Sequence, residues 1–322
     1  MTGSARTVLG DAPADQLGVT YAHEHVILDS PLVEDRFRDI WLNDAVGAAE
    51  ELSACSAAGV GCVVDATPCG IGRDPIRLAD VSRRSGVEII ATTGLHTRKW
   101  YPGLSWANEA DPDILSGLFI ADLLDGIDRY DYRGPVITRT PHRAGLIKVG
   151  TLQEVFNARD RRVFAAAAAA HRVTGAPILT HCEGGRGGLE QVEALGEFGV
   201  DPARVVLSHT DKVDDIGYHL DLAATGVNLE YDQALRHPID ETNPTVLLVI
   251  AMADAGYAAQ LMVGTDGARR ALWTAYGGAP GLAALAIDVV AVLVRRGVSE
   301  DAVTQILRSN PARFFSFTEV AA

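Results

Sequence analysis

The 322-residue sequence predicts an α/β fold in which strands and helices alternate eight times along the chain. Apolar runs of strand length recur, and longer stretches with helical period separate them. No Ser/Gly-rich linker or break in composition divides the chain, so we expect one domain over residues 1–322. This length and alternation favour a closed (β/α)8 barrel, the TIM barrel, and a doubly wound open sheet is the weaker alternative.

The individual elements follow from these runs in chain order. After a short N-terminal segment, in which Gly10 and Gly18 signal turns, the expected strands span residues 19–28, 61–66, 88–93, 145–149, 177–181, 205–209, 227–231 and 260–266. The expected helices between and after them span residues 43–58, 75–85, 112–129, 158–174, 188–198, 214–224, 244–255 and 280–296. A last helix over 299–307 and the Ser309-Asn310-Pro311-Ala312 segment are expected to cap the barrel.

Composition argues against several classes of protein. The formal net charge is −14, which disfavours binding to nucleic acid because a phosphate backbone needs clustered positive charge. Residues 1–15 contain no apolar core of a signal peptide, and the apolar stretch 281–294 is interrupted by Asp288 and too short to span a bilayer. The four cysteines form no CxxC pair. We therefore expect a cytoplasmic protein with a small-molecule substrate, bound to neither membrane nor nucleic acid.

Ionisable side chains recur where the expected strands end, which is where a barrel of this kind carries its catalytic groups. They are His23, His25, Asp65, Lys148, His181, His209, Glu230 and Asp266. In His23-Glu24-His25 the two imidazoles are two residues apart, so in an extended strand they point the same way and both reach one ion. Glu24 would face the opposite side as a structural residue. The triplet is thus half of a metal site.

Each of these residues alone has an ordinary explanation. An isolated His-x-His pair is also explained by hydrogen bonding in a core or at a surface, and a lone histidine such as His181 or His209 more often has that role. Four histidines at strand ends, followed by Gly264-Thr265-Asp266 at the last one, are hard to assign to packing. Together they predict a metal centre at one end of the barrel.

Lys148 is a rare residue type in an apolar place. The chain has three lysines among its 28 basic residues, and this one lies within Gly145-Leu146-Ile147-Lys148-Val149-Gly150. Burial of an unpaired ammonium group lowers its pKa and leaves a neutral, nucleophilic amine. Such an amine can capture carbon dioxide as a carbamate, whose two oxygens suit two metals. A Schiff-base lysine, or a lysine paired with Asp65 or Asp266, is the alternative.

Short motifs in a characteristic order cover essentially the whole chain. They are Thr7-Val8-Leu9-Gly10, Leu17-Gly18, Tyr21-Ala22-His23-Glu24-His25, Asp65-Ala66-Thr67-Pro68, Thr93-Gly94, Gly145-Leu146-Ile147-Lys148, His181, Ser208-His209 and Gly264-Thr265-Asp266. With these motifs the chain resembles the phosphotriesterase-like branch of the amidohydrolase superfamily. The ordered set is far more specific than any single motif.

The resemblance assigns the metal ligands to two groups. By analogy with the family, His23, His25 and Asp266 would hold the more buried α metal. His181 and His209 would hold the more exposed β metal. Both ions would be divalent, with zinc the first expectation and manganese, cobalt and iron the alternatives, because this donor set accepts all of them. The family also implies a homodimer.

The mechanism that the resemblance implies needs no side-chain nucleophile. An N6-carboxylated Lys148 and a hydroxide from solvent would bridge the two ions. The cations would acidify the bridging water and polarise the substrate's carbonyl or phosphoryl oxygen, which the hydroxide would attack. Asp266 would then take the proton and deliver it to the leaving group.

The loops must decide the substrate, since lactone opening and the cleavage of phosphotriesters, esters or amides share this chemistry. Family lactonases that accept acyl-homoserine lactones often carry a Tyr after the glycine that ends the third strand, where this chain has Leu95. Arg269 and Arg270 follow Asp266 and would clamp a phosphate or carboxylate, as in the family's sugar lactonases. The alternative is that one of them only pairs with a nearby carboxylate.

We therefore expect a binuclear metal-dependent lactonase that acts on a small polar lactone, phosphorylated sugar lactones included. A phosphotriesterase, or a carboxylic ester or amide hydrolase, on the same centre is the second expectation. A metal- or ligand-binding barrel without turnover is the third. Further expected substrate contacts, beside the two arginines, are His96, Tyr231 and Arg236.

Overall fold

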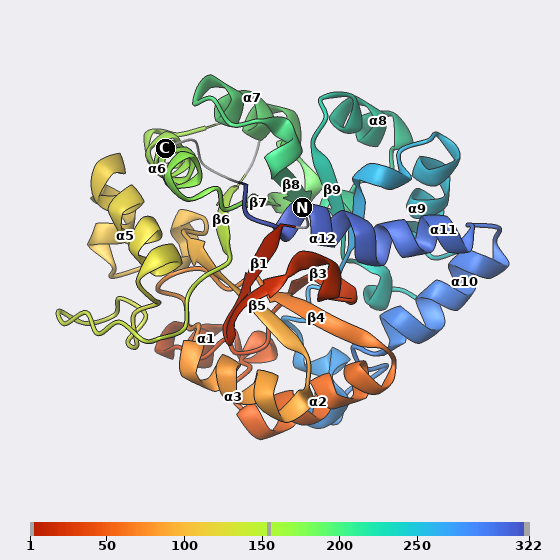
Figure 1. The fold of residues 1–322 in the computed structure, drawn as a ribbon, viewed down its shortest axis with the longest axis horizontal. Coiled ribbons are helices and arrows are strands. Elements are labelled where there is room, and N and C mark those ends of the chain that lie inside the picture. Colours follow the sequence, from red (N-terminus) through yellow and green to blue (C-terminus); the bar gives the residue numbers. More distant parts are fainter. Residues whose placement is uncertain (1–2, 153–155, 319–322) are drawn as a thin grey trace.

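Eight parallel strands form one sheet in the computed structural model, which describes residues 3–152 and 156–318 (Figure 1). Each strand pairs with the next one in chain order, and helices separate them. The strands are β3 (Val19–Glu24), β4 (Val60–Asp65), β5 (Glu88–Gly94), β6 (Leu146–Thr151), β7 (Ile178–Cys182), β8 (Val205–Ser208), β9 (Asn228–Tyr231) and β10 (Leu261–Val263). This order confirms the α/β barrel that the sequence predicts.

The first and last strands of the sheet meet and bring the barrel nearly to closure. The backbone N–H groups of Thr265 and Asp266, just past β10, donate to the carbonyl oxygen of His23 in β3 over 3.2 and 3.0 Å. A Cβ at Gly264 would lie 2.6 Å from the same oxygen, so only glycine allows this approach. The Gly264-Thr265-Asp266 motif therefore joins the ends of the sheet and places Asp266 beside the first strand.

Helices surround the barrel (Figure 1). Several begin with a polar cap followed by proline; the Asp74 carboxylate, for example, accepts the N–H groups of Ile76 and Arg77 at the start of α3. The helices are α1 (Pro31–Arg36), α2 (Ala45–Ala57), α3 (Pro75–Ser85), α4 (Ser105–Glu109), α5 (Pro112–Leu124), α6 (Ala158–Thr174), α7 (Gly188–Glu197), α8 (Ile216–Ala224), α9 (Pro244–Asp254), α10 (Val290–Arg295), α11 (Glu300–Thr304) and α12 (Asn310–Phe315). The short helices α1 and α4 lie in loops and are not predicted by the sequence pattern.

Some element bounds differ from the sequence prediction. The helix expected over 112–129 ends at Leu124, because the chain beyond it folds back on itself and Ile127 donates its N–H to the carbonyl of His142 over 2.8 Å. The helix expected over 299–307 is α11, which a helical turn continues into α12. β3 and β10 end before their expected bounds, so His25 and Asp266 lie in the loops that follow them.

The interior of the barrel is layered, since alternate residues of each strand point inward. The lower layer is apolar and contains Ala22, Val64, Ile90, Leu146, Leu179, Val206 and Met262. Two residues further along these strands the inward positions become polar, with Thr92, Lys148, His181 and Ser208. A second, larger apolar core lies between the strands and the helices. The polar layer thus rests on a packed apolar base.

Both ends of the described chain lie at the lower end of the barrel. The strands β1 (Ser4–Thr7) and β2 (Gly10–Pro13) form an antiparallel hairpin, and the carbonyl of Ser4 accepts the N–H of Phe317 over 2.9 Å. Phe314 and Phe315 of α12 pack into the apolar layer of the interior. The hairpin and α12 together close this end of the barrel.

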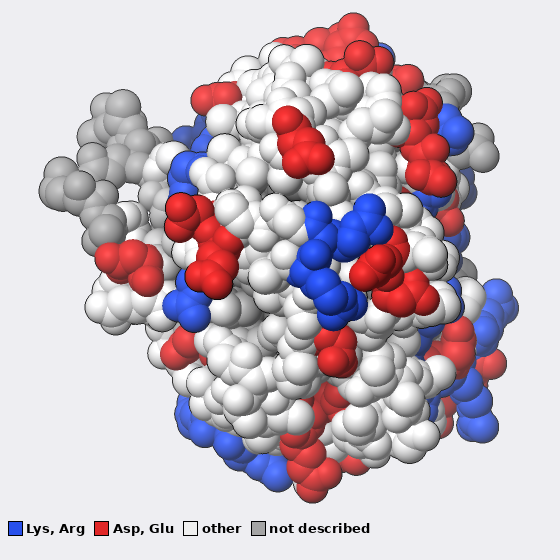
Figure 2. Space-filling model, turned by 90° about the vertical axis from the view of Figure 1, so that its right-hand side faces the viewer, with Lys and Arg blue, Asp and Glu red and all other residues white. Residues whose placement is uncertain are grey.

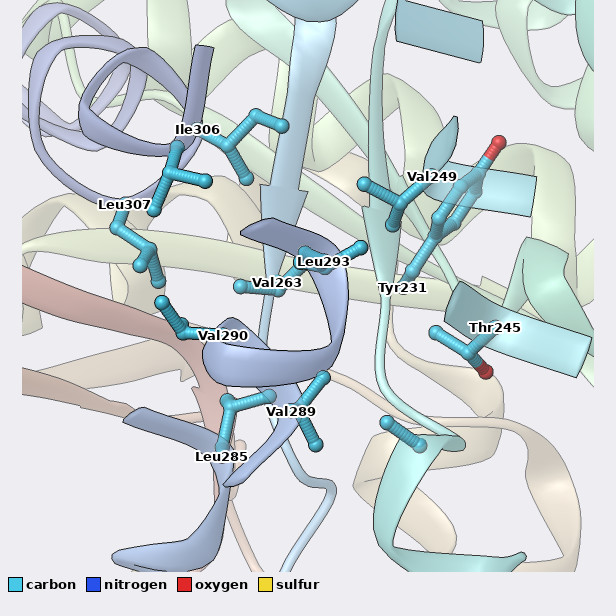
Figure 3. Close-up of a pocket in the computed structure, with 12 residues that line it drawn as sticks. Tyr231, Thr245, Val249, Val263, Leu285, Val289, Val290, Leu293, Ile306 and Leu307 are labelled. Carbon is cyan, nitrogen blue, oxygen red and sulfur yellow. The ribbon is translucent and has the colours of Figure 1, made fainter. Parts of the chain in front are cut away.

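An apolar cavity lies in the outer core, between β9, β10 and the last helices (Figure 3). Its described lining is aliphatic, apart from Tyr231, Thr245 and the backbone. A cavity of this kind offers neither a metal-ligand set nor a charged group to a polar ligand. This apolar cavity is therefore not the candidate functional site.

Charge on the surface is mixed on the face shown in Figure 2. Acidic side chains form several groups there, and basic ones form a compact group near the centre, with acidic neighbours, and further groups toward the edges. In the last part of the chain, an exposed ion pair joins Arg295 and Glu241 over 3.6 Å. None of the described helices combines the length and apolar character needed to cross a bilayer.

The four cysteines, Cys55, Cys62, Cys69 and Cys182, are free and buried. Burial raises the pKa of the Cys182 thiol to about 12, so the thiolate is scarce at neutral pH. This cysteine follows His181 directly in β7, but it packs in the outer core. It therefore acts as a small apolar residue.

Truncation of Phe315 should destabilise the fold because this side chain is fully buried at the closed end of the barrel. We expect Phe315→Ala to lower the free energy of unfolding by about 3–5 kcal/mol, measured by urea denaturation. Ile287→Ala is the control, since Ile287 is 55% exposed, and a change within about 0.5 kcal/mol is expected there. Equal effects of the two substitutions would contradict the packing described for α12.

Candidate metal centre

A pocket opens at the C-terminal end of the barrel, above the polar layer of its interior. It encloses about 770 Å³, its open mouth included. Five of the residues that the sequence assigns to a metal centre line it: His25, Lys148, His181, His209 and Asp266. The sixth, His23, lies beneath them and is fully buried. The strand ends thus bring all six side chains to one place.

A β-bulge in β3 sets the direction of the first histidine pair. Residues 21–24 of β3 lie opposite residues 63–65 of β4, so β3 carries one extra residue at this point. Ala22 packs in the apolar layer of the interior, and the extra residue lets His23 face inward as well. His25 follows two residues later on the same side. A regular strand with Ala22 inward would have turned His23 away.

Three donor atoms converge at the base of the pocket. Nε2 of His23 lies 4.0 Å from Oδ1 of Asp266, and Nε2 of His25 lies 3.6 Å from the same oxygen. The ligand atoms of the three residues all lie within 4.8 Å of one another. Two imidazoles and a carboxylate at this spacing suit one divalent cation.

Lys148 extends into the same place from β6. Its Nζ lies 3.0 Å from Nε2 of His23, and the residue is 1% exposed. Burial lowers the pKa of Lys148 to about 8, so the neutral amine is accessible near neutral pH. Gly94 of β5, with φ +101°, lies directly against the Lys148 backbone, where a Cβ would overlap the carbonyl oxygen. Glycine is therefore required next to this lysine.

His181 and His209 lie beside each other at the ends of β7 and β8, with ring centroids 4.6 Å apart. The ring of His23 is also 4.6 Å from that of His209, so the two expected ligand groups are adjacent. His209 has φ +65° and Asp266 has φ +42°, which are left-handed conformations that residues other than glycine rarely adopt. Backbone strain of this kind concentrates at functional sites.

One ring nitrogen of each histidine contacts another polar side chain. Nδ1 of His25 lies 2.7 Å from Oγ1 of Thr67, whose backbone N–H donates to Oδ1 of Asp65 over 2.9 Å. A proton on Nδ1 that is donated to this hydroxyl leaves Nε2 of His25 free for a cation. Nε2 of His181 lies 2.8 Å from Oε2 of Glu183, which leaves Nδ1 free.

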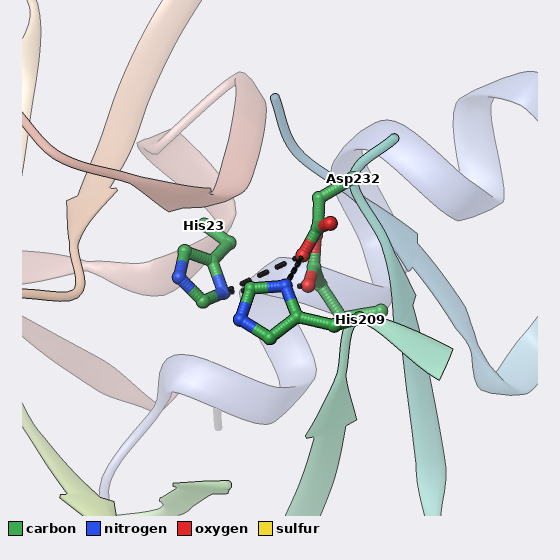
Figure 4. Close-up of side chains that lie close together, drawn as sticks. His23, His209 and Asp232 are labelled. Carbon is green, nitrogen blue, oxygen red and sulfur yellow. Dashed lines mark ion pairs between the residues drawn. The ribbon is translucent and has the colours of Figure 1, made fainter. Parts of the chain in front are cut away.

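His23 and His209 share buried acidic partners (Figure 4). Nδ1 of His209 lies 2.6 Å from Oδ2 of Asp232, and Nδ1 of His23 lies 3.8 Å from the same oxygen. Oε2 of Glu230 lies 3.4 Å from Nδ1 of His23. Carboxyl groups on the Nδ1 side favour a proton there. A proton on Nδ1 would leave Nε2 of each ring unprotonated and available to a cation.

All four histidines are neutral at neutral pH, as metal ligands have to be. Burial lowers the pKa of His23, His25 and His209 well below the usual range for histidine. The pKa of His181 falls to about 4, again mainly because of burial. A cation that binds these nitrogens therefore does not have to displace protons from the rings.

Asp266 is held from two sides. Nη2 of Arg236 donates to its backbone oxygen and to its Oδ2, each over 2.6 Å. Glu24, on the other face of β3, accepts the N–H and hydroxyl of Thr265 and the N–H of Gly267. Burial raises the pKa of Asp266 to about 6. A pKa near neutrality suits a carboxylate that takes up and releases a proton.

Positive charge gathers at the pocket. Arg236, Arg269 and Lys212 line it, and the last two are exposed. His96 lines the pocket as well, with its ring 4.4 Å from that of His181. Three of the expected substrate contacts, His96, Arg236 and Arg269, thus line the pocket. Lys212 is not predicted, because it follows His209 in a loop without a recognisable pattern.

Two expected substrate contacts lie outside the pocket, which corrects the sequence prediction. Arg270 donates from Nη1 to the carbonyl of Trp41 over 2.8 Å and stacks on the Tyr276 ring at 3.9 Å. It therefore anchors its loop, and the expected arginine pair is divided. Tyr231 points to the outer side of β9, where its hydroxyl lies 2.9 Å from Nδ1 of His219. Neighbouring strand residues face opposite sides, so Tyr231 cannot share the inward face of Glu230.

The polar partners of the histidines are the residues that sequence reasoning does not identify. Thr67 lies in the quoted Asp65-Ala66-Thr67-Pro68 motif, and Glu183 lies two residues after His181 in a glycine-rich loop. Asp232 directly follows β9. A polar residue within two positions of a strand end is a weak signal, but here it marks three of the side chains that orient the ligands.

The arrangement fits divalent cations. Imidazole nitrogens without a protein acceptor, a carboxylate and a buried amine converge on one pocket, and histidine with carboxylate is a typical donor set for zinc and its neighbours. Such a cluster at the C-terminal ends of barrel strands is the site of a metal-dependent hydrolase.

Comparison with known proteins agrees with this class. The model of the Phosphotriesterase family matches residues 3–315. A phospho-furanose lactonase of Mycoplasmopsis synoviae is 31% identical, over 98% of this chain and 92% of its own length. The chain belongs to the phosphotriesterase family, which confirms the resemblance seen in the sequence.

Solved structures extend this similarity to the whole fold. A lactonase of Listeria monocytogenes superposes with a TM-score of 0.89 at 26% identity, covering 98% of this chain and 100% of its own. The phosphotriesterase homology protein of Escherichia coli, whose active site holds phosphate, gives 0.84 at 28% identity, over 93% and 99% of the two chains. The fold is therefore that of a family of metal-dependent hydrolases.

Loss of the Thr67 hydroxyl should weaken the binding of one of the two metal ions. Thr67→Val keeps the shape of the side chain but removes the acceptor for Nδ1 of His25. We expect affinity for one cation to fall about 10–100-fold, measured by titration of metal-free protein with Co²⁺. The matched control is Thr97→Val, because Thr97 contacts His96, which is not an expected ligand. Unchanged affinity in Thr67→Val would contradict the orienting role.

Proposed function

We propose that this protein hydrolyses small polar lactones that carry an anionic group, with phosphorylated sugar lactones as the first candidates. The observation that carries the proposal is the pocket lining: Lys212, Arg236 and Arg269 face the same space as the histidines. Guanidinium and ammonium groups at the mouth would bind the anion while the ring is opened below. The similarity to a phospho-furanose lactonase and to a structure with phosphate in its active site supports this substrate class.

The metal ligands would be those assigned from the sequence. One cation would be held by His23, His25 and Asp266, the other by His181 and His209, and both by N6-carboxylated Lys148. When bound there, two divalent cations, zinc as the first candidate, supply the Lewis acidity that acidifies water and polarises a carbonyl oxygen. The histidines need no rearrangement, because their free nitrogens already face the pocket.

The carbamate on Lys148 is part of the proposal. The amine of Lys148 would add to carbon dioxide and release one proton, which gives a carbamate with two oxygens and one negative charge. A pKa of about 8 for Lys148, lowered by burial, makes the neutral amine available for this step. The negative charge would also offset part of the charge of the two cations.

Asp266 would hold the proton that leaves the attacking water and pass it to the leaving alkoxide. Its two oxygens have separate tasks in this proposal. Oδ2 accepts from Arg236 over 2.6 Å, and Oδ1 lies 3.6 Å from Nε2 of His25 on the metal side. Arg236 would therefore keep the carboxylate oriented while the proton moves.

Cleavage of phosphotriesters is the second candidate function. The wall of the pocket that includes Leu28, Ile71 and Trp100 is apolar and would accept neutral ester groups. The exposed cations Lys212 and Arg269 have no role for an uncharged triester, which is why we rank this activity below the anionic lactone.

Removal of the Lys148 amine should empty the metal centre. We expect wild-type protein to hold about two transition-metal equivalents per chain by elemental analysis, and Lys148→Ala to lose most of both. The circular dichroism of the variant should remain that of the wild type. A wild-type protein that binds no metal, or a variant that keeps both equivalents, would overturn the proposed centre.

Arg269 should determine selectivity for the charged substrate. We expect Arg269→Ala to reduce kcat/KM for phosphorylated lactones about 10–100-fold, which is the effect of losing a charged hydrogen bond, and to leave neutral lactones nearly unchanged. Arg270→Ala is the matched control, because its guanidinium contacts Trp41 and Tyr276 and not the pocket. Equal losses on charged and neutral lactones would rule out the anion-binding role.

A further inference from the structure

Two of the histidines form a compact group with two buried acids (Figure 4). It consists of His23, His209, Glu230 and Asp232, whose ligand atoms all lie within 4.8 Å of one another. Asp232 and Glu230 are fully buried. The proposed hydrolysis uses the two histidines as ligands of different cations, but it gives no task to the two acids.

The group is not a third metal site. Nδ1 of His209 and Oδ2 of Asp232 are 2.6 Å apart. A cation that bound both atoms at about 2 Å each would need a wider separation. The contact is an ion-pair distance between an imidazole nitrogen and a carboxylate oxygen, with no room for a cation between the two atoms. The acids therefore act on the rings and not on an ion of their own.

Asp232 and its backbone are held by neighbours other than the histidines. Its Oδ1 accepts from the side-chain amide of Gln233. Its backbone N–H and that of Gln233 both donate to Oδ2 of Asp211, over 3.0 and 2.8 Å. The Asp211 carboxylate accepts the hydroxyl of Thr245 as well, over 2.7 Å. The carboxylate of Asp232 is thus held in place by contacts that do not involve any metal ligand.

One oxygen of Asp232 faces a ligand from each proposed site. Oδ2 lies 2.6 Å from Nδ1 of His209 and 3.8 Å from Nδ1 of His23. Glu230 completes the group on the His23 side, since its Oε2 lies 3.4 Å from the same Nδ1 and its ligand atoms lie within 4.8 Å of those of Asp232. A negative charge next to Nδ1–H makes the opposite nitrogen a stronger metal ligand and fixes the plane of the ring.

We propose that Asp232 is a positioning residue that couples the two metal sites, an inference that rests on the two-metal centre proposed above. Because a single charge acts on one ligand of each cation, both affinities depend on the same side chain. Coupling of this kind is reciprocal, so each cation would also influence the retention of the other through Asp232. A purely structural carboxylate would affect folding and leave the affinities in place.

Asp232→Asn tests the proposal with little change of shape. Gln233 can turn its amide over, so the variant keeps the hydrogen bonds and loses the negative charge. Metal-free protein is titrated with Co²⁺, and the visible absorption bands and the bound metal after gel filtration are measured. We expect the dissociation constants of both equivalents to rise about 10–100-fold and the bands of both to shift, while circular dichroism stays unchanged.

Asp211→Asn is the matched control. It keeps an oxygen to accept the backbone N–H groups of residues 232–233 and changes the other oxygen to an amide, and Asp211 hydrogen-bonds to none of the histidines. We expect both equivalents to bind as in the wild type. If Asp232→Asn fails to fold, Asp232→Glu replaces it, and the charge restored at another distance should give bands and affinities different from the wild type for both equivalents.

The outcomes separate this inference from the function on which it rests. A wild-type protein that binds no Co²⁺ would refute the two-metal centre itself. If the wild type binds two Co²⁺ ions, the coupling is refuted when Asp232→Asn lowers the affinity for only one of them or for neither. It is refuted also when Asp211→Asn weakens the binding of both metal ions to the same extent, since the effect would then not be specific to Asp232.

Discussion

Three buried histidines and the partly buried His181 lie at one end of this barrel, and each has one nitrogen near a polar side chain. Burial disfavours the charged form of all four rings, so they lie together as neutral groups. Divalent cations would use these neutral rings as ligands. The rest of the site is arranged so that these nitrogens converge.

The backbone departs from regular geometry at the points where this convergence requires it. The bulge in β3 turns His23 inward above Ala22, and left-handed backbone at His209 and Asp266 brings both side chains over the barrel axis. Contacts that involve no metal ligand stabilise these departures. The Glu24 carboxylate, for example, binds the backbone on both sides of Asp266 from the outer face of the same strand. The strained positions are therefore supported by buried acids in a second layer.

Sequence reasoning predicts the architecture and places the candidate ligands at one end of the barrel, because both depend on local pattern. Strand period gives the barrel, and the His-x-His pair, Lys148 and Asp266 lie within β3, β6 and β10 or in the loops that directly follow them. The orienting partners depend on packing between strands that are distant in sequence. Nothing in the sequence pairs His209 with Asp232, since that contact requires the register of β8 against β9. Thr67 and Glu183 are hidden for the same reason.

Side-chain direction in loops is the other feature that the sequence does not specify. Arg269 and Arg270 look equivalent as neighbours, yet the first lines the pocket and the second is bound to Trp41 and Tyr276. The pair divides because the loop after Asp266 is held on its outer side by Glu51 on α2, which accepts the N–H groups of Ala275 and Leu282. This attachment fixes which arginine faces outward.

Protein contacts orient the imidazoles before any metal binds. The ¹⁵N NMR spectrum of the histidine rings in metal-free protein tests this most directly, because it distinguishes protonated from unprotonated ring nitrogens. We expect a proton on Nδ1 in His23, His25 and His209 and on Nε2 in His181. Averaged tautomers, or a proton on the nitrogen that faces the pocket in any of the four, would contradict this expectation.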